Sequence, residues 1–238
     1  MTGDMQAFFE VHRGLLREGP GLPEDVHWAL AQIKPPARVL DAACGPGADT
    51  ATLAEALPQA RIEAVEMVPH FVTEARERTA GFGDRIMVLE ADMLSMSGPY
   101  DLIWCAGAVY FAGIARALGA WRKALSPGGY VAFSEPVLEP GASKAARRFW
   151  DGEGQVSSEA QVLSQVQAAG YRVLETRRIV GAAWEAYYTP MQAHIDALRA
   201  ANLADAVAQA CDQAEAEMSN WRAARDEVAY LLILARCE

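Results

Sequence analysis

The 238-residue sequence is poor in cysteine, has no long apolar run and carries no excess of positive charge. Its four cysteines are scattered and form no C-x-x-C pair, which argues against a structural zinc site and fits a reducing cytosol. No apolar run approaches the ~20 residues that a membrane-spanning helix needs. The formal net charge of −10 opposes nonspecific binding to nucleic acid, because that binding depends on lysine and arginine.

The first four residues lack the basic and apolar regions of a signal peptide, so we expect a cytoplasmic protein with no membrane partner. Hydrophobic residues make up 52% of the chain and charged residues 22%, which is enough for a sizeable core. A chain of this length is expected to form one large domain, or a domain with a lid.

The chain alternates short apolar segments with helical ones, which is typical of a parallel sheet covered on both faces. We expect strands beginning at residue 39 and covering 61–66, 85–93, 100–106, 129–135, 171–180 and 227–235. The pattern predicts an α/β fold with a doubly wound, mostly parallel sheet. We divide the chain into an N-terminal helical cap at 1–34, a ligand-binding α/β core at 35–182, a helical insertion or lid at 183–226 and a final core strand at 227–238.

A glycine turn follows the first strand, within residues 39–50. Gly45 and Gly47 carry no side chain, so a ligand can approach the backbone closely there. The turn departs from the dinucleotide pattern G-x-G-x-x-G, because Thr50 stands at the third glycine. The carboxylate of Asp41 would repel a pyrophosphate and suits a ligand with positive charge near the turn. The methionine moiety of S-adenosylmethionine, with its ammonium and sulfonium groups, is such a ligand.

Two further acids follow the next two strands. Glu66 ends the second strand, where a doubly wound fold places a carboxylate against ribose hydroxyls. Asp92 lies just beyond the third strand, where it can accept a hydrogen bond from an adenine amino group. Asp41 alone could simply cap its turn, but the order of the three acids favours a cofactor site.

These residues resemble the class I S-adenosylmethionine-dependent methyltransferases over roughly residues 36–136. The resemblance rests on the motif at 41–47, the two later acids, the segment 106–110 after the fourth strand and the turn 125–129 before the fifth. Ala43 departs from the family pattern, which usually has its first glycine there. Segments 17–23, 104–110, 133–136 and 183–188 resemble a bacterial subgroup that methylates small molecules.

The resemblance implies a seven-stranded, Rossmann-like sheet whose last strand runs antiparallel between the fifth and the sixth, with a helical cap. It implies S-adenosyl-L-methionine as the cofactor, S-adenosyl-L-homocysteine as its product, and no metal. The residues expected to bind the cofactor are Arg17, Asp41, Ala43, Cys44, Gly45, Gly47, Glu66, Met67, Asp92, Met93 and Ala106.

Five residues are candidates for contact with the acceptor. Tyr110, just after the fourth strand, is a catalytic and substrate-binding candidate, with core packing as the alternative. Glu135 ends the fifth strand and is either catalytic or a strand cap. His12 is either a general base or a packing residue of an apolar first helix. Trp184 and Tyr188 either bind substrate or form the buried face of a lid helix.

The sequence therefore predicts methyl transfer to a small-molecule acceptor by in-line displacement, catalysed mainly by positioning and desolvation. Two alternatives stay open: an RNA or protein methyltransferase, and a non-catalytic S-adenosylmethionine-binding interaction protein. We also expect residues 1–20 and 183–225 to cover the site, with a hinge at residues 19–21 and aromatic contacts from Phe8, Phe9, Trp184, Tyr187 and Tyr188.

Overall fold

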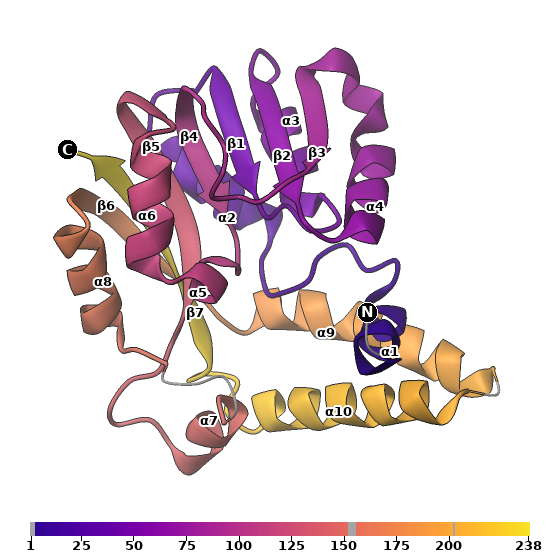
Figure 1. Ribbon diagram of the computed structural model, residues 1–238. Helices are drawn as coiled ribbons and strands as arrows, with labels where there is room; N and C mark the ends of the chain where they lie inside the picture. The colour runs from indigo at the N-terminus through magenta and orange to yellow at the C-terminus, as the bar shows by residue number, and fades with distance from the viewer. Residues whose placement is uncertain (1–2, 152–155, 202) are drawn as a thin grey trace.

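The computed structural model describes residues 3–151, 156–201 and 203–238. Its centre is a seven-stranded sheet with the order β3-β2-β1-β4-β5-β7-β6 (Figure 1). The strands are β1 (Arg38–Ala42), β2 (Arg61–Glu66), β3 (Ile86–Glu90), β4 (Tyr100–Cys105), β5 (Leu125–Val137), β6 (Tyr171–Ile179) and β7 (Ala229–Cys237). Strand β7 pairs antiparallel with both β5 and β6, and the other pairs are parallel. The predicted fold class and the place of the last strand are confirmed.

The apolar runs in the sequence are strands buried on both faces, as in most parallel sheets. In β1, residues 39–42 are all buried, and in β7 the same holds for residues 229–235. The third strand is shorter than predicted, since residues 91–93 lie beyond its end. Those residues belong to the loop at the carboxyl edge of the sheet, where ligands bind in open α/β folds.

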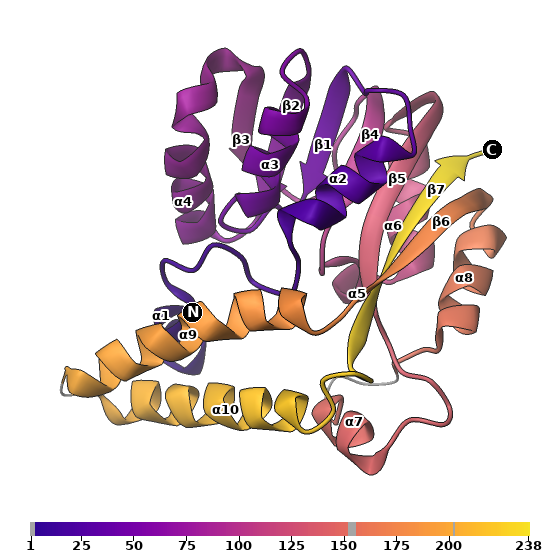
Figure 2. The same ribbon diagram turned by 180° about the vertical axis from the view of Figure 1, so that it is seen from behind.

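Helices cover both faces of the sheet. In Figure 2, α2 (Pro23–Ala31), α3 (Ala48–Ala56) and α4 (Pro69–Thr79) lie in front of it, followed by the 3-10 turn η1 (Ala80–Arg85). The opposite face carries α5 (Val109–Ala112), α6 (Ile114–Arg122) and α8 (Glu159–Ala168) (Figure 1). Helix α2 packs against α3 on one face of the sheet. The sequence predicts this helix as part of an N-terminal cap at residues 1–34. The division of the chain into domains stays a prediction.

A third layer lies across the carboxyl ends of the parallel strands. It consists of α1 (Gly3–His12), α9 (Ala182–Ala200) and α10 (Asp205–Arg222), with α7 (Lys144–Phe149) at one end (Figures 1 and 2). Helix α1 packs against both α9 and α10. Aromatic side chains fix this layer: Trp221 of α10 lies 6.2 Å from Trp184 and 5.3 Å from Tyr188, measured between ring centroids. None of the described helices combines the length and the apolar character needed to cross a membrane.

Candidate active site

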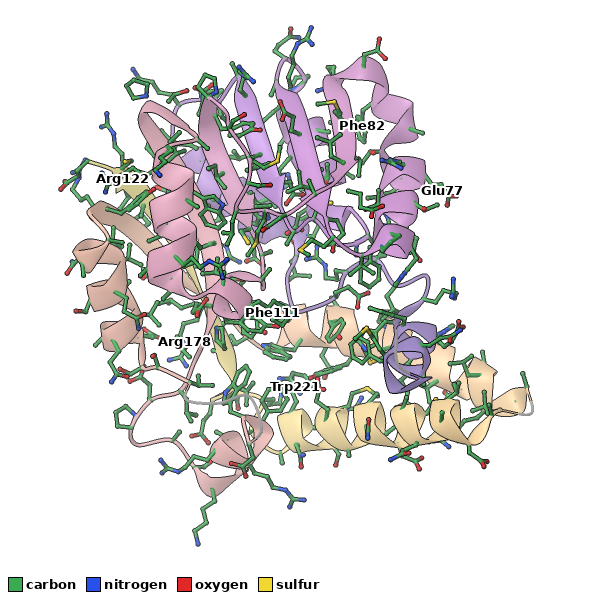
Figure 3. The ribbon with its side chains drawn as sticks, viewed as in Figure 1. Glu77, Phe82, Phe111, Arg122, Arg178 and Trp221 are labelled. Atoms are coloured by element: carbon green, nitrogen blue, oxygen red, sulfur yellow. The ribbon has the colours of Figure 1, made fainter. Side chains whose placement is uncertain are left out.

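A cavity of about 770 Å³ lies where the loops after β1, β2, β3 and β4 face the third layer. Figure 3 labels Phe111 on α5, which lines the cavity, and Trp221 on α10, which is buried in the third layer and does not line it. The cavity wall includes most of the predicted site residues, namely His12, Arg17, Asp41, Ala43, Cys44, Gly45, Glu66, Met67, Asp92, Met93, Ala106, Tyr110 and Trp184. It does not include Gly47, Glu135 or Tyr188.

The two glycines of the turn have different tasks. Both have a positive φ, +53° at Gly45 and +89° at Gly47. A Cβ atom at Gly47 would lie 3.0 Å from the Cα and Cβ atoms of Ala75 on α4, so this glycine allows close packing behind the cavity. A Cβ atom at Gly45 would meet only the Cγ atom of Glu18, at 3.8 Å, so Gly45 faces the cavity. Ala43 also has a positive φ of 58°, a conformation that costs a non-glycine residue roughly 1–2 kcal/mol.

The carboxylate of Glu66 holds the rim of this turn. The Gly45 N–H donates to its Oε2 atom at 3.0 Å, and the N–H groups of Met67 and Val68 donate to Oε1 at 2.7 and 2.9 Å. Glu66 is 9% exposed and lines the cavity. Each carboxylate oxygen has more than one acceptor position, so Glu66 can still accept hydrogen bonds from a ligand.

Asp41 lines the cavity on the side formed by the strand-end loops. Its carboxyl group is 1% exposed and accepts a hydrogen bond of 2.6 Å from the Thr50 hydroxyl. Burial, together with the nearby Asp49 and Glu66 carboxylates, raises the pKa of Asp41 to about 8. The Arg17 guanidinium acts in the opposite direction on this pKa.

Arg17 connects the N-terminal segment to the glycine turn. Its Nη2 atom donates to Asp49 Oδ1 at 2.9 Å, and Asp49 Oδ2 accepts from Trp104 Nε1 at 3.0 Å. The three side chains form a chain of polar contacts from residue 17 through α3 to β4. Both Arg17 and Asp49 line the cavity, so this wall carries a guanidinium next to carboxylates.

The opposite side of the cavity is aromatic. Trp150 stacks on Tyr230 with ring centroids 5.9 Å apart, and Trp184 meets Tyr230 edge-on at 5.6 Å. Tyr110 contacts Tyr230 edge-on at 6.5 Å. Trp184 has a packing role as well, because it is 3% exposed and its Nε1 atom donates to the Ile179 carbonyl.

Two polar pairs accompany these rings. His12 Nδ1 lies 2.6 Å from Glu18 Oε2, and both residues line the cavity. The Tyr188 hydroxyl donates to Glu217 Oε1 at 2.7 Å. Tyr188 is fully buried, so its contact with the site is through Glu217, which does line the cavity.

Cys44, predicted only to bind the cofactor, and Glu135, a catalytic candidate, do not suit nucleophilic or acid–base chemistry in the cavity. Burial raises the pKa of the Cys44 thiol, which disfavours the reactive thiolate. Glu135 lies on β5 outside the cavity wall, 9% exposed, with its Oε2 atom buried and without a hydrogen-bond partner. Its candidate catalytic role gains no support from this position.

Sequence reasoning missed several residues of the wall, chiefly Glu18, Asp49, Phe111, Arg116, Phe149, Trp150, Glu217 and Tyr230. Asp49 stands inside the quoted glycine-turn segment, and Glu18 lies next to Arg17, so both were within reach of a motif argument. Trp150, Glu217 and Tyr230 carried no such signal, because only the folding of distant segments brings them to the cavity. No group of three or more His, Cys, Asp or Glu side chains able to hold a metal occurs in the part of the chain that the structure describes.

Comparison with known proteins agrees with this geometry. Residues 39–129 match the family model of a methyltransferase domain. The chain is thus similar to methyltransferase domains over this segment, which holds the glycine turn and the three strand-end acids. The crystal structure of an S-adenosylmethionine-dependent methyltransferase from Geobacter sulfurreducens, in complex with S-adenosyl-L-homocysteine, has the same fold, with a TM-score of 0.83 over 97% of each chain at 20% identity.

Two curated relatives are similar over part of their length. A trans-aconitate 2-methyltransferase of Streptomyces avermitilis is 36% identical over 128 residues, which is 51% of this chain and 44% of the relative. A demethylmenaquinone methyltransferase of Thermus thermophilus is 33% identical over 114 residues, which is 44% of this chain and 52% of the relative. The matched part is thus about half the length of these curated relatives.

Glu135 generates a prediction about the stability of this protein. Burial raises its pKa to about 8, so between about pH 4 and 8 the folded chain holds a proton that the unfolded chain has lost. The free energy of unfolding should therefore fall as the pH rises through this range. Glu135→Gln removes the effect of this group, and Asp41 contributes in the same direction in both proteins.

Urea denaturation at pH 5 and pH 8.5 measures this difference. We expect the loss of stability between the two pH values to be smaller in Glu135→Gln than in the wild type. Glu175→Gln, on an exposed position of β6, should behave like the wild type. An equal loss in all three proteins would show that Glu135 does not hold its proton in the folded state.

Proposed function

We propose that this protein transfers the methyl group of S-adenosylmethionine to a small-molecule acceptor. The observation that carries the proposal is the two-sided cavity. Its donor side is built from polar residues of the strand-end loops, and its acceptor side from aromatic residues of the third layer. Its volume lies within the range of about 300–1,000 Å³ that is usual for small-molecule sites.

The donor side fits the amino-acid end of S-adenosylmethionine. That end carries an ammonium and a carboxylate, and the cavity wall offers the Asp41 carboxyl group and the Arg17 guanidinium. Both groups line the same cavity, and Asp49, which accepts a hydrogen bond from Arg17, lies one residue before Thr50, which donates to Asp41. An arginine is well suited to a carboxylate because its planar donors match two oxygens. Gly45 leaves the backbone open to the ligand between them.

The nucleoside end of the donor fits the next loops along the sheet edge. Glu66 would accept hydrogen bonds from the ribose hydroxyls, and its carboxylate is already oriented by three backbone N–H groups. Asp92 would accept from the adenine amino group. Its Oδ1 atom is bonded to the Leu94 N–H at 2.8 Å, which fixes the side chain at the cavity rim. Met67 and Met93 supply apolar surface for the base.

The bound donor would supply a methyl group on a sulfonium. The sulfur leaves as a neutral thioether, which is a good leaving group. The chain must therefore align the acceptor with the S–CH₃ bond and exclude water. Trp150, Trp184 and Tyr230 provide a rigid apolar wall for this purpose. Aromatic faces also tolerate the positive charge that leaves sulfur in the transition state.

A small acceptor agrees better with the structure than a macromolecule does. Helices α1, α9 and α10 lie across the carboxyl ends of the strands and form part of the cavity wall. The acidic net charge opposes binding of RNA. The two curated relatives are named for different acceptors, trans-aconitate and demethylmenaquinone, so they point to no common one. The acceptor must be inferred from the wall of this cavity.

The first prediction concerns the donor. S-adenosylmethionine and S-adenosyl-L-homocysteine should bind and raise the melting temperature, whereas NADH should not, because Thr50 breaks the dinucleotide pattern and Asp41 occupies the place beside the turn. Ligand linkage gives roughly 2.7 kcal/mol of stabilisation at a ligand concentration 100 times the Kd. Calorimetry and thermal melting measure both ligands. Binding of NADH without binding of S-adenosyl-L-homocysteine would contradict the assignment.

The second prediction concerns Glu66. Glu66→Ala should weaken binding of S-adenosyl-L-homocysteine by about 1.5–3 kcal/mol, because the lost hydrogen bonds are to a charged acceptor. Part of the loss comes from the glycine turn, since Glu66 also orients Gly45. Glu90→Ala is the matched control, because Glu90 is the register partner of Glu66 at the end of β3 and does not line the cavity. Equal affinity of the two variants would refute the ribose contact.

The third prediction concerns the N-terminal segment. The Arg17–Asp49 pair connects this segment to the donor side, so donor binding should order it. Hydrogen exchange should slow in residues 5–20 when S-adenosyl-L-homocysteine is added, while α6 at residues 114–122 serves as an internal reference. Unchanged exchange in residues 5–20 would mean that the segment is a fixed wall and not a lid.

A further inference from the structure

A glycine packs directly against the guanidinium of Arg17. Gly21 is buried, and a Cβ atom added there would lie 2.5 Å from Arg17 Nη1 and 3.5 Å from Arg17 Cζ. Its φ lies outside the left-handed region, so the backbone conformation by itself does not require a glycine. The space taken by the guanidinium is therefore what keeps a side chain from this position.

Asp49 holds the same guanidinium from α3. Arg17 Nη2 donates to Asp49 Oδ1 at 2.9 Å, and Asp49 Oδ2 accepts from Trp104 Nε1 at 3.0 Å. The side chains of Arg17 and Asp49 are only 14% and 10% exposed. Within the described residues Arg17 makes no other hydrogen bond, so most of its five N–H donors stay available to a ligand.

The chain at Gly21 is fixed by the start of α2. The Leu22 N–H donates to Asp25 Oδ2 at 2.9 Å, and Asp25 Oδ1 lies 3.0 Å from Arg177 Nε on β6. Helix α2 packs in turn against α3. A side chain at position 21 would therefore displace the guanidinium, which is the far end of a flexible side chain, and would leave the backbone in place.

The displacement is large enough to matter for binding. Non-bonded heavy atoms pack at about 3.5 Å or more, so Arg17 Nη1 would move by about 1 Å. Under the proposed function this guanidinium receives the carboxylate of S-adenosylmethionine with two parallel hydrogen bonds. That arrangement depends on the position of the guanidinium plane, and a misplacement of about 1 Å is enough to lose much of its contribution.

We propose that Gly21 is a positioning residue for donor binding, because its missing side chain leaves the space from which Arg17 receives the donor carboxylate. The proposal rests on the methyltransferase function proposed above and adds a residue that acts on the donor without touching it. Gly21 does not line the cavity, whereas Arg17 does. The effect of position 21 on the donor must therefore pass through Arg17.

Two ligands that differ only in the carboxylate test this role. They are S-adenosyl-L-homocysteine and S-adenosyl-3-thiopropylamine, its decarboxylated form, and calorimetry measures the Kd of each. The wild type should bind S-adenosyl-L-homocysteine more tightly than the decarboxylated ligand. In Gly21→Ala the Kd of S-adenosyl-L-homocysteine should rise about tenfold, while that of the decarboxylated ligand stays within about twofold. An equal rise for both ligands would indicate general damage to the site and would overturn the proposal.

Gly19→Ala is the matched control for chain flexibility. Gly19 belongs to the same segment, its φ lies outside the left-handed region, and a Cβ atom there would meet no atom within 4 Å apart from its chain neighbours. Although Gly19 borders the cavity, its alanine variant should keep the wild-type ratio of the two Kd values. A change of this ratio as large as that in Gly21→Ala would assign the effect to the hinge at residues 19–21 and overturn the proposal.

A double variant shows whether position 21 acts through the guanidinium. Adding Gly21→Ala to Arg17→Ala should change the Kd of S-adenosyl-L-homocysteine by less than about twofold, because the added Cβ atom then meets no guanidinium. A further loss of about tenfold in the double variant would contradict the proposal. Thermal melting covers the case in which Gly21→Ala does not fold. The double variant should then recover the fold, and a double variant that also fails to fold would overturn the proposal.

The same titrations separate this proposal from the proposed function. If S-adenosyl-L-homocysteine does not bind to the wild type, the methyltransferase assignment has failed, and the role of Gly21 falls with it. If it binds, but the wild type does not prefer it to the decarboxylated ligand, or Gly21→Ala keeps the wild-type preference, the donor assignment stands and the role of Gly21 has failed. Where the decarboxylated ligand binds too weakly to measure, the comparison of Arg17→Ala with the double variant decides.

Discussion

Hydrogen bonds at the end of β2 fix the donor side of the site. The Glu66 carboxylate accepts from Gly45, Met67 and Val68, which joins the turn after β1 to the turn after β2. Two backbone contacts continue the connection: the Cys44 N–H donates to the Val65 carbonyl at 2.9 Å, and the Ala91 N–H donates to the Glu66 carbonyl at 3.0 Å. Three neighbouring loops are therefore held in one arrangement before any ligand binds, and the cost of ordering them is met during folding.

The donor side was predictable because its residues follow local rules. In a parallel sheet, side chains just after the carboxyl ends of neighbouring strands meet at one edge, so strand ends found in the sequence place Asp41, Glu66 and Asp92 together. The glycine turn was recognisable for the same reason. The packing role of Gly47 was not predictable. It depends on Ala75 of α4, and the sequence of the turn does not show that α4 packs against it.

The acceptor side was only partly predictable. Trp184, Tyr187 and Tyr188 have helical spacing and are all buried, as expected of one face of α9. Spacing does not say which of them reaches the cavity, and Tyr188 instead holds Glu217. Glu18 and Glu217 lie near opposite ends of the chain, and both line the cavity because α1 packs against α10. No local pattern encodes such a contact.

The segment between α1 and α2 connects the two sides of the cavity. Arg17 is bound to Asp49 at the start of α3, and the next residue, Glu18, is bound to His12 on α1. A Cβ atom on Gly45 would lie 3.8 Å from the Glu18 side chain, so the segment also approaches the glycine turn. Any shift of this segment moves a residue of the donor wall and a residue of the acceptor wall together. Under the proposed function, a donor bound by Arg17 would also fix Glu18 and His12, which favours an order in which the donor binds before the acceptor.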